Sequence, residues 1–166
     1  TEALFNGPAP RIVPLDPKWG QKEDHQTYVI QEFEFNDRPG HNCHGWLARP
    51  KNPALAKLPA IIALHGHNGR AYRIFQKGYY FYGDLLAKKG YIVLAIDINH
   101  LALDHPGPYL DRGPVIHFKH HTPMGERVWM VLRAIDLLQT LPDVDPEKIG
   151  IVGLSLIHIS EPTRPY

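Results

Sequence analysis

The sequence predicts an α/β fold in which short buried strands alternate with helices and build a mostly parallel sheet. Two continuous apolar runs, 60–64 and 149–152, each lead directly into a glycine-containing turn, as strands buried on both faces do. Between them, residues 123–141 carry apolar side chains at steps of three and four, which predicts an amphipathic helix. The order strand, helix, strand is typical of parallel strands joined by right-handed crossovers.

The first part of the chain divides into a lead segment and a hairpin. Residues 1–27 contain four prolines and few periodic apolar positions, so we expect an extended segment without regular structure on the domain surface. From Tyr28 to Phe35 the residues alternate and are rich in β-formers, 36–40 supplies a turn, and Cys43 to Ala48 is a second β-rich run. These patterns predict an antiparallel hairpin.

Further elements follow from local signals. Residues 81–89 carry Leu85 and Leu86 on one helical stripe and end at Gly90, which predicts a helix followed by a strand over 91–98. Thr122 and Pro123 form a cap and first turn for the longest helix, and Asp143 to Lys148 reads as a turn. The core positions that we expect on the longest helix are Val128, Val131, Leu132, Ile135, Leu138 and Leu141.

Composition narrows the classes of function. With 43% hydrophobic and 21% charged residues in 166, the chain has the makeup of one globular domain. A formal net charge of +1 provides no basic surface for nucleic acid, and no apolar run is long enough to cross a membrane. Cys43 is the single cysteine, so no intramolecular disulfide can form. No signal peptide is visible, which leaves the localisation open.

The first motif that could carry chemistry is His65, Gly66, His67, Asn68 and Gly69, directly after a buried strand. Backbone N–H groups of a glycine-rich loop can stabilise the oxyanion that forms during acyl transfer. An ordinary glycine-rich turn explains the motif about equally well. A phosphate-binding loop fits less well, because the Lys and Ser/Thr of that motif are missing.

The second motif is Gly153, Leu154 and Ser155 at the end of the strand 149–152. In a nucleophile elbow the serine occupies a tight strand-to-helix turn with small residues two before and two after it. Gly153 meets the first requirement, whereas Ile157 stands where the second small residue belongs. By spacing alone, a serine that ends a strand is more often a cap than a nucleophile.

Other polar residues have simpler explanations. Glu126, Arg127, Trp129, Arg133 and Asp136 fit an amphipathic helix packed on the sheet, with Arg133 and Asp136 paired, although Arg127 and Trp129 could help to shape a pocket. The histidine cluster lacks the glutamate and the helical placement of a zinc motif, so we expect no metal and no cofactor. Its members are His117, His120 and His121.

Together these segments resemble the α/β-hydrolase superfamily, specifically the acetyl xylan esterase and dienelactone-hydrolase-like branch. The resemblance rests on 60–69, on the helix 125–141 with its Gly-Glu-Arg-Val-Trp start, and on 144–155, which reads Val-Asp-Pro-Glu-Lys-Ile-Gly-Ile-Val-Gly-Leu-Ser. It implies a partial α/β-hydrolase domain over 28–153, the N-terminal half of that fold. The antiparallel hairpin comes first and parallel strands with crossover helices follow, up to the strand that leads into the elbow.

The resemblance also implies roles for individual residues. Ser155 would be the nucleophile, and the backbone N–H groups of Leu156 and His67 would form the oxyanion hole. The orienting acid and the activating histidine would follow later in the chain, because this fold orders its triad as serine, acid, histidine. The intact parent would then be a serine-dependent esterase acting on a small-molecule or carbohydrate ester, and the 166 residues by themselves would be inactive.

Residues 154–166 depart from the family pattern. Leu154 to Arg164 resembles the translation of a transposon-end sequencing adapter, so we expect this tail to be non-native and Ser155 to stand in the right register with an uncertain origin. Two other functions stay open: a serine peptidase of the prolyl-oligopeptidase type, which shares the elbow, and a non-catalytic binding protein of the same fold.

Overall fold

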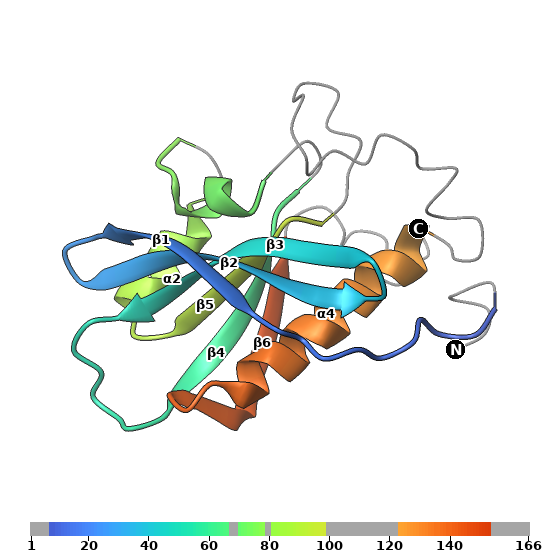
Figure 1. The fold of residues 1–166 in the computed structure, drawn as a ribbon. Helices are drawn as coiled ribbons and strands as arrows, with labels where there is room; N and C mark the ends of the chain where they lie inside the picture. The colour runs from blue at the N-terminus through green and yellow to red at the C-terminus, as the bar shows by residue number, and fades with distance from the viewer. Residues whose placement is uncertain (1–6, 67–69, 79–80, 99–122, 154–166) are drawn as a thin grey trace, which may run out of the picture.

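The structure, a computed structural model, describes residues 7–66, 70–78, 81–98 and 123–153 (Figure 1). These residues form one six-stranded sheet in the order β1-β2-β3-β5-β4-β6. Its strands are β1 Lys18–Asp24, β2 Tyr28–Arg38, β3 His41–Pro50, β4 Leu58–Leu64, β5 Ile92–Ile96 and β6 Val144–Gly153. The helices in the described ranges are the 3₁₀ helix η1 Ala71–Phe75 and the α-helices α2 Tyr82–Lys88 and α4 Pro123–Thr140.

The sheet has an antiparallel half and a parallel half. Strands β1, β2, β3 and β5 pair antiparallel in that order, whereas β4 pairs parallel with both β5 and β6. The predicted hairpin followed by parallel strands is therefore confirmed. A mostly parallel sheet is an overstatement for the described residues, because the hairpin and β1 extend the antiparallel side.

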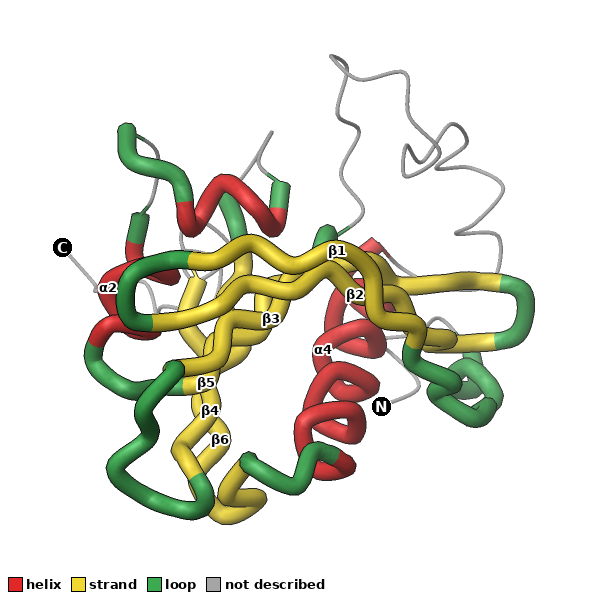
Figure 2. The backbone as a smooth tube through the Cα atoms, turned by 60° about the vertical axis from the view of Figure 1, so that its left-hand side comes forward, coloured by secondary structure: helices red, strands yellow, loops and turns green. Residues whose placement is uncertain are grey.

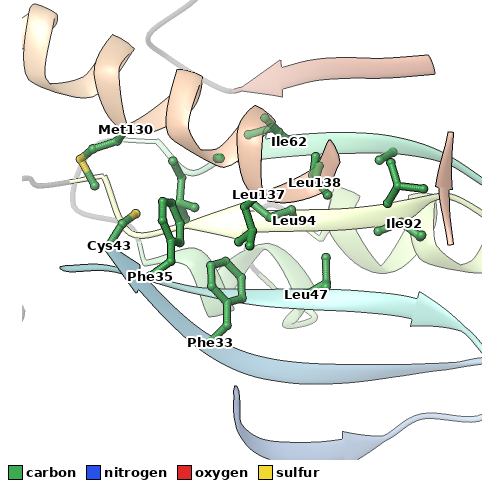
Figure 3. Close-up of a cluster of buried hydrophobic side chains, with 14 of the residues drawn as sticks. Phe33, Phe35, Cys43, Leu47, Ile62, Ile92, Leu94, Met130, Leu137 and Leu138 are labelled. Atoms are coloured by element: carbon green, nitrogen blue, oxygen red, sulfur yellow. The ribbon is translucent and has the colours of Figure 1, made fainter. Parts of the chain in front are cut away.

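The helices lie on both faces of the sheet. Helix α4 covers one face, and α2 with η1 covers the other (Figure 2). Between the sheet and α4 lies the larger buried cluster, in which Phe33, Leu47 and Leu94 meet Met130 and Leu137 (Figure 3). Strand β5 is buried along its whole length, as expected for a strand with helices over both faces.

Helix α4 spans nearly the predicted range, and most of the expected core positions face the sheet: Leu138 is buried, and Val131, Ile135 and Leu141 pack against the same cluster, partly buried. The buried apolar residues are Trp129, Met130, Ala134, Leu137 and Leu138. Leu132, which we expected in the core, is 45% exposed. The buried face therefore overlaps the predicted stripe but also includes Met130 and Leu137, and Leu132 lies outside it.

Helix α2 corrects a second expectation. Leu85 is 53% exposed, whereas Gly83, Asp84 and Ala87 are buried. A Cβ at Gly83 would stand 2.8 Å from Ile74 Cγ1, so the absence of a side chain permits the close approach of η1. The predicted glycine stop is confirmed, because Gly90 follows the helix at φ +92°.

Two segments predicted as irregular contain strand. β1 lies inside the lead segment and pairs with β2, so the expectation of no regular structure up to residue 27 was wrong. β6 begins at Val144 rather than at Ile149. Its register changes between the pairs Leu58↔Val144 and Ala60↔Ile149, so the predicted turn is an irregular stretch within the strand.

The lead segment is tied to the domain before β1 begins. The Asn36 N–H donates to the carbonyl of Leu15 at 2.8 Å. Arg133, buried on α4, donates from Nη2 to the carbonyl of Val13 at 2.7 Å and from Nη1 to Asp136, its predicted partner. Because one guanidinium satisfies both groups, the segment follows the surface beside α4, as Figure 1 shows.

Candidate active site

The carboxyl ends of three parallel strands meet at one edge of the sheet. Leu64, the last residue of β4, lies opposite Ile96 at the end of β5 and opposite Gly153 at the end of β6. His65 is the first residue after β4, and Asp97 is the first residue after β5. In open α/β sheets, ligands bind beyond the carboxyl ends of the strands, so this edge is the candidate active site.

His65 is buried, with 1% of its surface exposed, and both of its ring nitrogens have backbone partners. Nε2 lies 3.2 Å from the N–H of Ile98 and accepts from it, while Nδ1 lies 2.9 Å from the carbonyl of Gly66 and donates to it. This pattern requires the neutral ring with its proton on Nδ1. Burial lowers the pKa of His65, which favours the same state.

Asp97 follows β5 and joins two neighbouring elements. Its Oδ1 accepts the N–H of Ala71 at 2.6 Å, and its Oδ2 lies 2.6 Å from Nδ1 of His44. Burial would raise the pKa of this carboxyl, but the hydrogen bonds from His44 and Ala71 hold it below its usual value. Asp97 is therefore an ionised carboxylate at the start of η1.

His44 on β3 completes this cluster. Its Nε2 lies 2.9 Å from Oε1 of Glu32 on β2, so each ring nitrogen faces a carboxylate oxygen. Burial alone would lower the pKa of His44, but the hydrogen bonds and charges of Asp97 and Glu32 raise it. With a carboxylate oxygen at each ring nitrogen, this environment favours the protonated ring, in contrast to the environment of His65.

A second buried polar cluster joins the hairpin to α4. Asp37 is fully buried; its carboxylate lies 2.5 Å from Nδ1 of His41, and its carbonyl accepts from Nε1 of Trp129 at 2.8 Å. Arg38 pairs with the buried Glu126. Trp129 therefore ties α4 to the end of β2, a structural role that we had not assigned to it.

The predicted site residues divide into two groups. His65 and Gly66 lie at the carboxyl edge of β4, where we expected the oxyanion loop, the glycine-rich motif of residues 65–69, to begin. The others fall outside the described residues, so their roles stay predictions; these are His67, Asn68, Gly69, Ser155 and Leu156, together with the cluster His117, His120 and His121.

Three residues of this edge were not predicted from the sequence: Asp97, His44 and Glu32. Asp97 could have been found by the rule that singled out His65, because it is the first polar residue after a continuous apolar strand. His44 and Glu32 carry no such signal, since alternation along a hairpin normally places polar side chains in solvent. Only the contact between β3 and the end of β5 brings His44 to Asp97.

The described ranges contain neither a metal site nor a membrane-spanning helix. Within 7–66, 70–78, 81–98 and 123–153, no group of three or more His, Cys, Asp and Glu side chains could hold a metal ion. Among the helices of the same ranges, none is long and apolar enough to cross a membrane.

Comparison with known proteins gives the fold its name. No protein-family model matches the sequence. The solved structure of a candidate acetyl xylan esterase from Bacteroides fragilis, BF1801, superposes with a TM-score of 0.73 at 19% identity over 93% of this chain. The acetyl xylan esterase of Paenibacillus sp. R4 gives 0.64 at 22% identity over 85%. The chain adopts part of the α/β-hydrolase fold.

The match to α/β-hydrolases covers only part of each related protein. The chain covers 44% of the Bacteroides structure and 46% of the Paenibacillus structure. YtaP of Bacillus subtilis, a provisionally assigned hydrolase, is 29% identical over 154 residues, which cover 79% of this chain and 49% of YtaP. The chain thus spans about half the length of the first curated relative that it matches.

Proposed function

We propose that the protein to which this chain belongs is a serine-dependent carboxylic-ester hydrolase that works through an acyl-enzyme. One observation carries the proposal: Leu64 lies between Ile96 and Gly153 in the parallel register. The glycine-rich segment that follows β4 and the Gly-Leu-Ser segment that begins at the last residue of β6 therefore start from neighbouring strands at the same edge of the sheet. An α/β-hydrolase requires this juxtaposition of oxyanion loop and nucleophile.

The proposed reaction uses groups that open at this edge. The hydroxyl of Ser155 attacks the ester carbonyl, its proton passes to a histidine, and the backbone N–H groups of Leu156 and His67 stabilise the tetrahedral oxyanion. Collapse of this intermediate expels the alcohol, which takes the proton from the histidine, and leaves the acyl group on the serine. Water activated by the same histidine then releases the acid and restores the hydroxyl.

The described residues support the part of this site that contains the start of the oxyanion loop. His65 uses both ring nitrogens on backbone groups, so it orders the start of the segment and is not available as the general base. The base and its orienting acid would come from later positions, as the triad order of the fold requires. For that reason we propose that the 166-residue polypeptide by itself does not hydrolyse esters.

The proposed substrate is a small-molecule or carbohydrate ester. Acetyl xylan esterases are among the solved structures with this fold, which makes acetylated carbohydrates and small aryl acetates the first substrates to test. Peptide substrates belong in the same assay, because a prolyl-oligopeptidase-type enzyme shares the elbow. Hydrolysis of peptides without hydrolysis of acetyl esters would overturn the esterase assignment.

The first experiment concerns the origin of Ser155. We propose that residues 154–166 derive from a sequencing adapter, and that the natural reading frame carries a serine at 155 and a small residue two positions later. Resequencing the source DNA beyond the Gly153 codon decides this. A natural frame with another residue in place of the serine would remove the proposed nucleophile.

The second experiment uses the protein expressed from the complete reading frame. A fluorophosphonate probe should label the wild type and the Thr140→Ala variant equally, whereas Ser155→Ala should abolish both labelling and hydrolysis of aryl acetates. Thr140 is the matched control because its hydroxyl donates locally to the Leu137 carbonyl at the end of α4. Labelling that survives in Ser155→Ala would place the nucleophile elsewhere, and a protein that binds esters without labelling would be a binding protein.

A further inference from the structure

The proposed mechanism leaves unused the cluster of Glu32, His44 and Asp97. His44 lies on β3 with 9% of its side chain exposed, and it contacts a carboxylate through each ring nitrogen. The backbone adds a further tie, since the N–H of Asp97 donates to the carbonyl of His44 at 2.9 Å. His44 is therefore joined to the residue after β5 twice, once through its side chain and once through its backbone.

Asp97 transmits this contact to the segment that follows His65. Its second carboxylate oxygen accepts the N–H of Ala71, the fully buried first residue of η1. The N–H groups in the first turn of a helix have no partner inside the helix, so an acceptor here determines where η1 begins. The next residue, Ile98, donates its N–H to His65. Asp97 thus holds Ala71, and Ile98 holds His65. These two held residues lie on either side of the segment 66–70 in the sequence.

A carboxylate bound on one oxygen only can rotate about its Cα–Cβ and Cβ–Cγ bonds. In the structure the Nδ1–H of His44 holds Oδ2, and this leaves Oδ1 directed at the Ala71 N–H. Glu32 holds the opposite side of the imidazole and so fixes the plane of the ring. Three hydrogen bonds thus connect Glu32 to His44, His44 to Asp97, and Asp97 to Ala71.

We infer that His44 is a positioning residue for the oxyanion loop, residues 65–69: its Nδ1–H orients Asp97, and Asp97 anchors Ala71, the first residue of η1, which follows that loop. The inference rests on the proposed esterase function, since it assigns the anchored segment to oxyanion stabilisation. His44 touches neither the substrate nor the reacting atoms. Its effect on the reaction passes through the backbone that Asp97 holds.

Among the described residues, charged groups reach or face His44 from β2 and from the end of β5. Glu32 contacts it from β2, Glu34 lies opposite it in the β2–β3 register, and Asp97 contacts it from the end of β5. His65 accepts from the N–H of Ile98, the residue after Asp97, and its two backbone hydrogen bonds fit the neutral ring. Since the neutral form of His44 can keep its proton on Nδ1, the anchoring of Ala71 depends on that N–H and not on the charge.

Two substitutions separate the two sides of the imidazole. In His44→Asn the side-chain amide stands near the position of Nδ1, so it can still donate to Asp97 but loses Glu32. In His44→Gln the amide reaches the position of Nε2, so it keeps Glu32 and loses Asp97. Both variants remove the charge and one hydrogen bond. A role in sheet stability alone would therefore affect the two variants alike, whereas positioning of the loop would distinguish them.

The test is carried out on the protein from the complete reading frame. Hydrogen exchange at the Ala71 amide should accelerate more than tenfold in His44→Gln and less than threefold in His44→Asn, estimates that correspond to loss or retention of one buried hydrogen bond. With an aryl acetate, kcat should fall about tenfold or more in His44→Gln with little change in KM, and His44→Asn should recover most of the loss. His25→Gln, at the start of the hairpin beside Glu23, is the control and should change neither readout.

Equal effects of the two His44 variants on Ala71 exchange and on kcat would overturn the inference while leaving the esterase function standing. If the wild-type protein hydrolyses no ester, the proposed function fails, and Ala71 exchange alone decides whether His44 holds this segment through Asp97. If exchange separates the variants but kcat does not, the anchor exists and has no part in catalysis, which also overturns the inference.

Discussion

Gly153 lies directly beside Leu64 in the parallel register of β6 and β4, and a Cβ at Gly153 would stand 3.2 Å from the Cβ of Leu64. The two residues end the strands that lead into the proposed nucleophile segment and the proposed oxyanion loop. Their close approach fixes the spacing of these segments at the sheet edge. The absence of a side chain at Gly153 is what allows it.

Alanine substitutions at three glycines should have graded effects on stability. Gly45→Ala should cost about 3 kcal/mol, because its Cβ would collide with the carbonyl oxygen of Ala95 and with the ring of Phe33. Gly153→Ala should cost about 1 kcal/mol, since Leu64 must shift by a few tenths of an ångström. Gly150→Ala, with no atom within 4 Å, is the control and should be neutral within about 0.5 kcal/mol.

Urea unfolding of the three variants measures these differences in the free energy of unfolding. A Gly150→Ala variant as unstable as Gly45→Ala would show that β6 packs differently from the described arrangement.

Leu137 and Leu132 test the two positions of α4 at which the observed burial departs from the expectation. Leu137→Ala should destabilise the domain by about 3 kcal/mol, because Leu137 is fully buried against the sheet. Leu132→Ala should cost less than about 1 kcal/mol, because Leu132 is 45% exposed. Denaturant midpoints of the two variants compare these positions directly, and an equal loss would show that Leu132 is buried, as the sequence predicted.

The outer edge of β6 should promote association of the 166-residue polypeptide. Within the described residues β6 ends the strand order, and Ile151 on it is 55% exposed. An apolar strand edge pairs readily with another chain, and a lysine on it opposes that pairing. We therefore expect Ile151→Lys to shift the polypeptide towards monomer in sedimentation velocity.

Leu55→Lys is the matched control, because Leu55 is 58% exposed but lies between β3 and β4, away from this edge. A wild-type polypeptide that is monomeric and unfolds reversibly would contradict the prediction for β6.

His44 and His65 should give opposite slopes of stability against pH. The pKa of His65 is lowered in the folded state, so its contribution is complete above about pH 6.5 and is lost as the pH falls below that value. The pKa of His44 is raised, so its contribution is complete below about pH 6.5 and is lost as the pH rises through the folded value. The combined contribution of the two histidines is therefore largest near pH 6.5.

Single variants separate the two slopes. His65→Asn should flatten the dependence of the unfolding free energy on the acid side of pH 6.5, and His44→Asn should flatten it on the alkaline side. Measurements at fixed ionic strength across this range test both signs, and a His44→Asn variant that changes only the acid side would refute the assignment.

Local sequence patterns were sufficient for most of the architecture. The continuous apolar runs of β4 and β5 and the glycine stop at Gly90 depend on interactions within a few residues, and the structure confirms them. Periodicity predicted the length of α4 and most of the positions that pack on the sheet, but it placed Leu132 in the core and left out Met130 and Leu137, because burial depends on how the helix lies on the sheet. β1 escaped prediction because an edge strand that is largely exposed needs no apolar alternation.

In the candidate site, too, some residues could be found from local sequence patterns and others only from the tertiary structure. His65 and Gly66 could be found from sequence, because a polar, glycine-containing turn after a buried strand is a local signal for the carboxyl edge of a sheet. His44, Asp97 and Ala71 are far apart in the chain, and only the pairing of β3 with β5 and the position of η1 bring them together. Their hydrogen bonds depend on distances that folding alone establishes, so no spacing along the sequence could reveal them.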